Sequence, residues 1–276
     1  MFELNCKGRS LTVDKPLVMG IINITPDSFY SGSRRSGLHE ILKAAEQMIQ
    51  DGADILDIGG QSTRPGSELI SADEELKRVL EPVKAIYNYF PQSLISIDTF
   101  YSKVAKETID AGASIINDIS AGGMDENMIQ VIALLEVPYV LMHMQGVPKT
   151  MQAHPFYENV TSEVFGFLQK KIKSLQEAGI KDIIIDPGFG FGKTITHNFE
   201  LLQNLSSFEK LQCPILAGLS RKSFIYKSIG ATSGNALTGT IVLNTIALLN
   251  GAKILRVHDV KEAKQTIQLV EAYTNK

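Results

Sequence analysis

Residues 17–23 read LVMGIIN, an apolar run of strand length that ends in an asparagine. Strands that are apolar on both faces are typical of a parallel sheet covered by helices. Further runs of this kind follow along the chain, at 53–60, 94–99, 114–120, 138–144, 182–188, 214–220 and 253–259. Residues 17–23 are therefore predicted to form the first strand of a parallel sheet.

The segments between these runs carry apolar residues every three to four positions, the spacing of amphipathic helices. Helices are expected at 38–50, 72–90, 102–111, 159–178, 234–250 and 260–273. Eight strand–helix units in about 250 residues predict an α/β fold, a closed (β/α)8 barrel. A doubly wound open sheet is the alternative. Against it, the first strand runs into NITPD at 23–27 and not into a Gly-x-Gly-x-x-Gly fingerprint.

Residues 1–276 are expected to form a single domain, because no Pro-rich or Ser-rich linker divides them. Residues 2–14 are predicted to form a small hairpin that closes the bottom of the barrel. Pro82 is expected to kink or restart the second helix, since proline lacks the N–H that a helix interior needs.

The composition is that of a globular chain with a large core, with 44% hydrophobic and 21% charged residues. The 27 Lys and Arg residues against 30 Asp and Glu give a formal charge of −3, so neither nucleic acid nor membrane is an expected partner. The two cysteines, Cys6 and Cys213, and an N-terminus without the order of a secretory signal favour a reducing compartment, the cytoplasm.

Polar groups follow each predicted strand, at the end where barrel enzymes carry their active sites. They are Asn23, Gln61 to Arg64, Asp98, Asn117, Met142 with His143, Asp186, Ser220 to Ser223, and Arg256 with His258. A single strand-end Asp or Asn is usually a turn or a helix cap. A polar group at every strand end, however, lowers stability unless a ligand binds there.

Asp98, Asn117 and Asp186 suggest recognition of a flat heterocycle with several donors and acceptors. An exocyclic amine beside a ring N–H, as in guanine or pterin, offers two parallel donors to one carboxylate, and Asp186 could accept both. A divalent metal cluster is the alternative for these acids. The His-x-His and paired-carboxylate spacings of metal hydrolases are absent from the sequence.

A second predicted cluster is cationic and contains Arg64, Lys222, Arg256 and His258. Residues two apart on a strand project to the same side, so Arg256 and His258 are expected to face one ligand, and the region of strands seven and eight commonly holds phosphate. Several fixed charges suit a diphosphate. A salt-bridged strand end with a core histidine is the alternative. Arg221 and Lys222 cannot both point inward from extended chain, and Lys222 is taken as the functional one.

Six segments carry a resemblance to a known family: 19–29 (MGIINITPDSF), 57–66 (DIGGQSTRPG), 116–119 (INDI), 186–193 (DPGFGFGK), 220–223 (SRKS) and 256–259 (RVHD). With these motifs in order along nearly the whole chain, the sequence resembles bacterial dihydropteroate synthases. The resemblance implies a (β/α)8 barrel that condenses 6-hydroxymethyl-7,8-dihydropterin diphosphate with p-aminobenzoate. The products would be 7,8-dihydropteroate and pyrophosphate, in folate biosynthesis.

The resemblance also implies three groups of binding residues. The pterin site would comprise Asp98, Asn117, Met142, Asp186, Phe191 and Lys222. The diphosphate site would comprise Asn23, Thr63, Arg64, Arg256 and His258, with Asn23 and the diphosphate holding Mg²⁺. The p-aminobenzoate site would comprise Phe29, Thr63, Pro65, Lys222 and Ser223, and sulfonamides should compete there. The chain departs from the commonest family pattern at Gln61, usually Glu, and at Ser31, frequently Asp.

The catalytic residues implied are Asp98, Lys222, Arg256 and His258. No general base is required because an arylamine is already neutral and nucleophilic near neutral pH. A dissociative substitution is the hypothesis, with positive charges on the leaving pyrophosphate and Asp98 stabilising the pterin methylene cation. The alternatives are a methyltetrahydrofolate-dependent methyltransferase and a non-catalytic pterin-binding paralogue. The family further implies a homodimer through the last helices, where 240–249 is apolar on more than one face.

Overall fold

The computed structural model describes residues 1–24, 34–62 and 67–274. Its strands are β1 (Phe2–Cys6), β2 (Arg9–Val13), β3 (Leu17–Asn23), β4 (Ile55–Gly59), β5 (Leu94–Asp98), β6 (Ile115–Asp118), β7 (Tyr139–Met142), β8 (Ile183–Asp186), β9 (Leu216–Ala217) and β10 (Ile254–Val257). Its helices are α2 (Arg34–Gln50), α3 (Ala72–Tyr89), α4 (Ser102–Asp110), α5 (Met128–Leu135), α6 (Val160–Glu177), α7 (Ile195–Gln203), α8 (Ser223–Ser228), α9 (Leu237–Leu249) and α10 (Val260–Thr274), with 3-10 helices η1 (Leu205–Leu211) and η2 (Ser233–Asn235).

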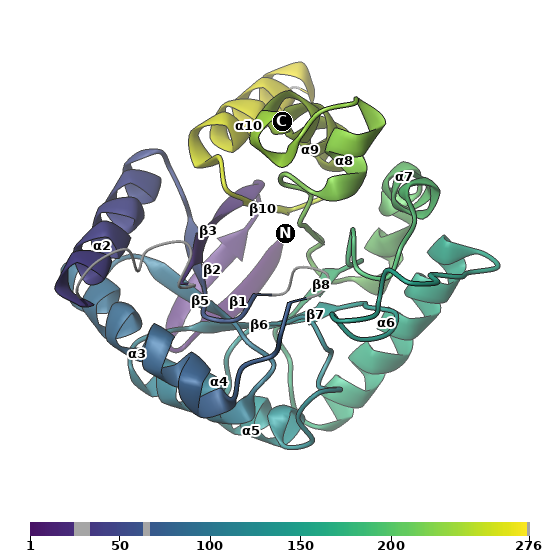
Figure 1. Cartoon of the computed structure of the whole chain (residues 1–276). Coiled ribbons are helices and arrows are strands. Elements are labelled where there is room, and N and C mark those ends of the chain that lie inside the picture. The colour runs from purple at the N-terminus through teal and green to yellow at the C-terminus, as the bar shows by residue number, and fades with distance from the viewer. Residues whose placement is uncertain (25–33, 63–66, 275–276) are drawn as a thin grey trace.

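Within the described residues, eight parallel strands form one sheet in the order β8-β7-β6-β5-β4-β3-β10-β9. The two edge strands meet, because the N–H of Ile185 donates to the carbonyl of Pro214 at 3.0 Å and Ile185 forms a parallel bridge with Ile215. Figure 1 shows the helices arranged around the outside of this ring of strands. The predicted (β/α)8 barrel is confirmed as a near-closed barrel.

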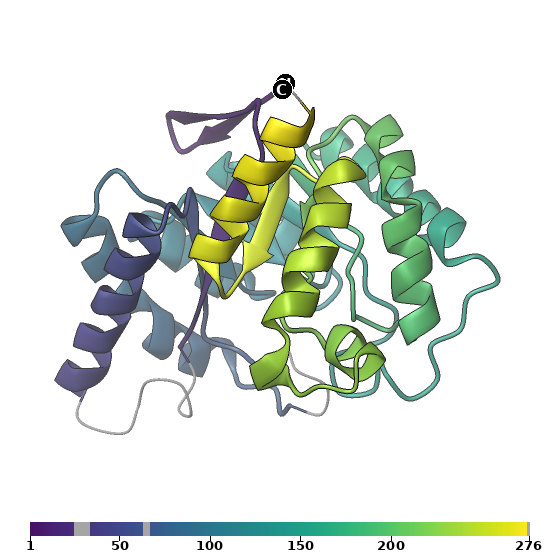
Figure 2. The same ribbon diagram turned by 90° about the horizontal axis from the view of Figure 1, so that it is seen from above.

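The N-terminal hairpin of β1 and β2 is antiparallel and lies across one end of the barrel (Figure 1). Its side chains Leu4, Cys6 and Val13 pack in one cluster with the first residues of barrel strands, such as Leu17 and Ile254. This apolar layer fills the end at which the parallel strands begin, as predicted. Figure 2 shows the hairpin at the same end of the molecule as the C-terminus, with α8 at the opposite end. A ligand can therefore bind only at the opposite end of the barrel, where the parallel strands finish.

Pro82 lies in the middle of α3, which runs from Ala72 to Tyr89 without interruption. The expectation that the helix restarts there is wrong. Pro82 is buried together with Val79, Val83 and Ile86, so packing of this apolar face holds the helix across the missing N–H. The last predicted helix but one, 234–250, instead begins at Leu237 after the short η2.

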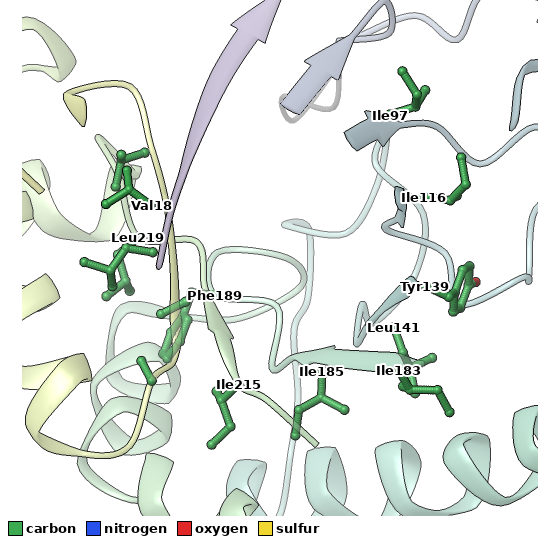
Figure 3. Close-up of a cluster of buried hydrophobic side chains, with 14 of the residues drawn as sticks. Val18, Ile97, Ile116, Tyr139, Leu141, Ile183, Ile185, Phe189, Ile215 and Leu219 are labelled. Atoms are coloured by element: carbon green, nitrogen blue, oxygen red, sulfur yellow. The ribbon is translucent and has the colours of Figure 1, made fainter. Parts of the chain in front are cut away.

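The main core lies between the strands and the surrounding helices. Val18, Ile97, Ile116 and Ile185 each point outward from their strands into this layer and are fully buried (Figure 3). At roughly 25 cal/mol for each Å² of apolar surface removed from water, this layer is the dominant stabilising contribution. The inward-facing positions near the strand ends are therefore free to carry polar groups. In the described ranges, no helix is both long and apolar enough to cross a membrane.

Candidate active site

Four strand positions at the carboxyl end of the barrel lie side by side in one layer. The register pairs Asn23 with Gly59, Gly59 with Asp98, and Asp98 with Asn117. Gly59 leaves room between its neighbours, since a Cβ there would lie 3.4 Å from Cβ of Asp98 and 3.8 Å from Oδ1 of Asn23. Strand pairing therefore places Asn23, Asp98 and Asn117 together, although they are far apart in sequence.

Arg256 on β10 bridges two carboxylates from other strands. Its Nε donates to Oδ2 of Asp57 at 2.6 Å, and its Nη2 donates to Oδ2 of Asp98 at 2.6 Å. Asp57, which the sequence reading did not select, is fully buried, and it also accepts from Nδ2 of Asn117 at 3.2 Å. These four side chains form one hydrogen-bonded network in the barrel interior.

Burial dominates the electrostatics of this network. Removal from water raises the pKa of Asp98, and the adjacent Arg256 cation opposes that rise. The same two carboxylates, Asp57 and Asp98, favour the charged form of Arg256 and keep its pKa raised although burial lowers it. The site thus holds a fixed cation beside a buried carboxylate.

Asp186 and Lys222 form the second charged pair. Asp186, at the end of β8, accepts the N–H of Gly188 at 2.7 Å on Oδ1. Its Oδ2 and Nζ of Lys222 both face Gly218, 3.6 Å and 3.9 Å from where a Cβ would stand. Burial raises the pKa of Asp186, and Lys222 opposes the rise. Burial lowers the pKa of Lys222 to about 8, against the attraction of Asp186.

Lys222 also contacts the 186–193 segment. Its Nζ donates to the carbonyl of Phe189 and lies 4.5 Å from the centre of the Phe191 ring, a cation–π contact. Met142, the register partner of Asp186, belongs to a small apolar cluster against which Phe191 packs. This region therefore combines one acid and one cation with flat apolar surface.

Lys193 is a buried cation that the sequence analysis did not assign a role. Its Nζ lies 3.0 Å from Nδ1 of His143 and donates to the carbonyls of Gly188 at 2.9 Å and Phe191 at 3.1 Å. Burial lowers the pKa of Lys193 to about 7. Burial and the Lys193 charge lower the pKa of His143 to about 3. His143 is thus a neutral partner that helps Lys193 fix the shape of this loop.

The side chains of Arg221 and Lys222 point in different directions. Arg221 adopts a positive φ of 54° and forms a bidentate pair with Asp259, at 2.6 Å and 2.9 Å. The turn directs the next residue, Lys222, toward Asp186. His258 follows β10 at an exposed position, with Nδ1 3.0 Å from Oγ of Ser220.

The remaining predicted residues divide into two groups. Ser223 is exposed and is the first residue of the six-residue helix α8. Phe29, Thr63, Arg64 and Pro65 lie outside the described residues, as does Ser31. Among the residues that the structure does describe, no three His, Cys, Asp or Glu side chains cluster in a way that could hold a metal.

Known proteins match this chain along nearly its whole length. A family model described as pterin binding enzyme matches residues 19–258. The dihydropteroate synthase of Escherichia coli is 43% identical over 272 residues, which cover 98% of this chain and 96% of that protein. The chain belongs to the dihydropteroate synthase family of pterin-binding enzymes.

Solved structures of dihydropteroate synthases share the fold over the full chain. The Yersinia pestis dihydropteroate synthase, in complex with a sulfonamide drug, superposes with a TM-score of 0.93 at 39% identity and full coverage of both chains. The Xanthomonas albilineans dihydropteroate synthase, in complex with 7,8-dihydropteroate, gives a TM-score of 0.90 at 36% identity, again with full coverage of both chains.

Proposed function

We propose that this chain is a working dihydropteroate synthase, which joins 6-hydroxymethyl-7,8-dihydropterin diphosphate to p-aminobenzoate with release of pyrophosphate. The observation that carries the proposal is the meeting of two acids, an amide and two cations at the carboxyl end of the barrel: Asp98, Asn117, Asp186, Lys222 and Arg256. The similarity to a structure that holds 7,8-dihydropteroate supports it. Residues 1–276 would act as a single domain in the cytoplasm.

The pterin would lie between the two acid groups. Asp186 keeps Oδ2 available beside Lys222, so it can accept the amino and ring N–H donors of the pyrimidine edge, while Lys222 donates to the ring carbonyl. Asn117 would supply a further polar contact. Met142 and Phe191 would cover the faces of the ring. A pterin satisfies several buried polar groups at once, which makes such recognition selective.

The diphosphate would bind toward β3 and β10. Among the described residues, Arg256 uses two of its five N–H donors on Asp57 and Asp98, and the other three could bind phosphate oxygens. His258, with Thr63 and Arg64, would complete this site. The positive groups would take up the charge that develops on the leaving pyrophosphate.

Asn23 has the chemistry to hold Mg²⁺ together with the diphosphate. Its amide oxygen lies at the barrel end beside Asp98, and a single protein oxygen suits an ion that keeps most of its ligands as water and phosphate. When bound, Mg²⁺ would neutralise phosphate charge. The residues present therefore fit the ion without a dedicated cluster of acids.

The proposed reaction is a dissociative substitution, in which the C–O bond to the diphosphate breaks before the amine nitrogen forms its bond. Asp98, whose carboxylate faces Arg256, would stabilise the pterin methylene cation. The amine of p-aminobenzoate attacks that carbon and afterwards loses a proton to water. Because the arylamine is neutral at neutral pH, no side chain has to remove a proton first.

The p-aminobenzoate would bind near the start of α8. Ser223 offers an exposed hydroxyl there, and Lys222 precedes it as the N-cap residue. Phe29, Thr63 and Pro65 would form the rest of this site. Sulfonamides would compete with p-aminobenzoate for these contacts.

A homodimer is part of the proposal. Helices α9 and α10 expose large apolar side chains: Val242, Ile246, Leu249, Leu269 and Tyr273. Exposed apolar patches of this kind commonly mark protein interfaces. Light scattering on the purified protein should give twice the chain mass, and a monomer would contradict this part of the proposal.

Product analysis tests the function itself. Purified protein incubated with the dihydropterin diphosphate, p-aminobenzoate and Mg²⁺ should form 7,8-dihydropteroate, detected by mass spectrometry, and a sulfonamide should suppress it. Pterin binding without product would favour the non-catalytic paralogue. Methyl transfer to cobalamin from methyltetrahydrofolate would favour the methyltransferase.

A further inference from the structure

Asp57 is a buried carboxylate that contacts one residue of the proposed pterin site and one residue of the proposed diphosphate site. It lies in the middle of β4 and has no solvent exposure. Its Oδ2 accepts from Nε of Arg256 at 2.6 Å, and the same oxygen accepts from Nδ2 of Asn117 at 3.2 Å. One carboxylate from β4 therefore holds side chains from β6 and β10.

The contact with Asp57 fixes the orientation of the Asn117 carboxamide. An amide can present either its NH₂ or its oxygen to a ligand, and the carboxylate accepts only from the NH₂. With Nδ2 directed to both oxygens of Asp57, at 3.2 Å and 3.4 Å, the Asn117 oxygen is left to accept from a pterin donor. The charge of Asp57 thus determines that Asn117 presents its oxygen, and not its NH₂, to a ligand.

The contact with Asp57 also fixes the Arg256 guanidinium. A guanidinium held through both Nε and Nη2 has little freedom to rotate about its side-chain bonds. Asp57 and Asp98 provide these two contacts from neighbouring strands. The remaining N–H groups of Arg256 are therefore held in one direction before any diphosphate arrives.

We propose that Asp57 is a positioning residue that couples pterin recognition to diphosphate binding, by orienting Asn117 and Arg256 through one carboxylate. This inference rests on the proposed function. It adds a residue that binds neither substrate directly. The alternative is a buried ion pair that only supports the barrel, in which case its loss would lower stability and leave the intrinsic affinities of the folded protein unchanged.

The Asp57→Asn variant tests the coupling. An amide at this position can accept from Arg256 or from Asn117 through its single oxygen, but its NH₂ then faces the other donor. Calorimetric titration would measure Kd for two separate probes, 6-hydroxymethyl-7,8-dihydropterin without diphosphate and pyrophosphate with Mg²⁺. Loss of a charge-assisted contact should weaken each by about tenfold or more.

Asp54→Asn is the matched control. Asp54 precedes β4, pairs with Lys264 at 3.0 Å and accepts the N–H of Val18 at 2.7 Å, away from Asn117 and Arg256. This variant should lower the melting temperature and leave both Kd values within about twofold of the unsubstituted protein, since its partners lie outside the network. Equal weakening in both variants would overturn the proposal.

The possible results distinguish a failure of the proposed function from a failure of the coupling alone. If the unsubstituted protein binds neither probe and forms no product, the proposed function and the coupling both fail. If it binds both probes and Asp57→Asn binds them equally well, or loses only one, the coupling alone is overturned.

A second variant applies if Asp57→Asn does not fold. Asn117→Leu removes the amide that contacts both oxygens of Asp57, so the carboxylate loses its contact from β6 and orients the guanidinium of Arg256 less well. Pyrophosphate binding should then weaken by about threefold, which corresponds to about 0.7 kcal/mol. An unchanged pyrophosphate Kd would overturn the coupling.

Discussion

Nη2 of Arg256 lies 2.6 Å from Oδ2 of Asp98, so the carboxylate proposed to stabilise a pterin cation already faces a fixed cation. Arg256 balances part of the Asp98 charge in the free protein. A diphosphate bound to Arg256 would offset the positive charge of the guanidinium. The negative charge of Asp98 would then be less neutralised and could stabilise a cation on the pterin. The pair is thus suited to a reaction in which positive charge grows on the pterin as pyrophosphate departs.

The Asp98→Asn variant should separate catalysis from binding. The amide keeps the size and a hydrogen bond to Arg256 but cannot stabilise a cation, so kcat should fall by about 100-fold or more. The Kd for the dihydropterin diphosphate should change by about tenfold at most, since one hydrogen bond is weakened. Steady-state kinetics and calorimetry on the same preparation measure both. Equal losses in turnover and binding would contradict the cation-stabilising role.

The pH dependence of kcat/KM should report the protonation of Lys222. Burial lowers its pKa to about 8, and Asp186, Arg256 and Asp98 are the charged groups that face it. Only the protonated amine donates to a ring carbonyl as a cation, so kcat/KM for the pterin substrate should fall by about tenfold for each pH unit above that value. A Lys222→Arg variant stays charged and should lose this limb of the profile. The same limb in that variant would assign it to another group.

The Ser223→Ala variant should weaken the binding of p-aminobenzoate alone. Ser223 is exposed at the start of α8, so its removal leaves the buried network intact. The KM for p-aminobenzoate should rise by roughly three- to tenfold, as for the loss of one hydrogen bond, while the KM for the pterin substrate stays constant. An unchanged p-aminobenzoate KM would remove Ser223 from that site.

Glu75 should make stability depend on pH. It lies in the first turn of α3 with no exposure, and burial raises its pKa from 4.5 to about 8. Between these values the folded protein holds a proton that the unfolded chain releases, so the contribution to stability is full below pH 4.5 and is lost as pH rises through about 8.

The Glu75→Gln variant removes this dependence. The melting temperature of the variant minus that of the unsubstituted protein should increase by about 5 °C between the two pKa values of Glu75. This corresponds to a few kcal/mol in the free energy of unfolding for a chain of this size. Thermal denaturation at a series of pH values measures the difference. A constant difference would show that Glu75 is not protonated in the folded state.

The fold could be predicted from the sequence because burial on both faces leaves a plain signal in each strand. The pairing of Asp98 with Asn117 and of Met142 with Asp186 follows from the same pattern, since parallel strands bring their carboxyl ends together. The prediction that Arg221 and Lys222 point in different directions rested on the alternation of an extended chain, whereas the structure has a turn at this place. The positive φ of Arg221 and its pair with Asp259 show how the turn achieves this.

Contacts between distant buried groups could not be predicted in the same way. Asp57 stood within the apolar run 53–60, where a charge is unusual, and that was the signal available for it. Its partners Asn117 and Arg256 are 60 and 199 positions away in sequence. Lys193 ended a recognised motif, but its burial against His143 depends on how the loop closes. Packing likewise decided that α3 continues through Pro82.

Pyrophosphate release tests the central claim most directly. The purified protein would receive the dihydropterin diphosphate and Mg²⁺, with and without p-aminobenzoate, beside a Lys222→Ala control. We expect release that requires both substrates and is lost in the control. Binding of the pterin substrate with no release in the presence of p-aminobenzoate would contradict it.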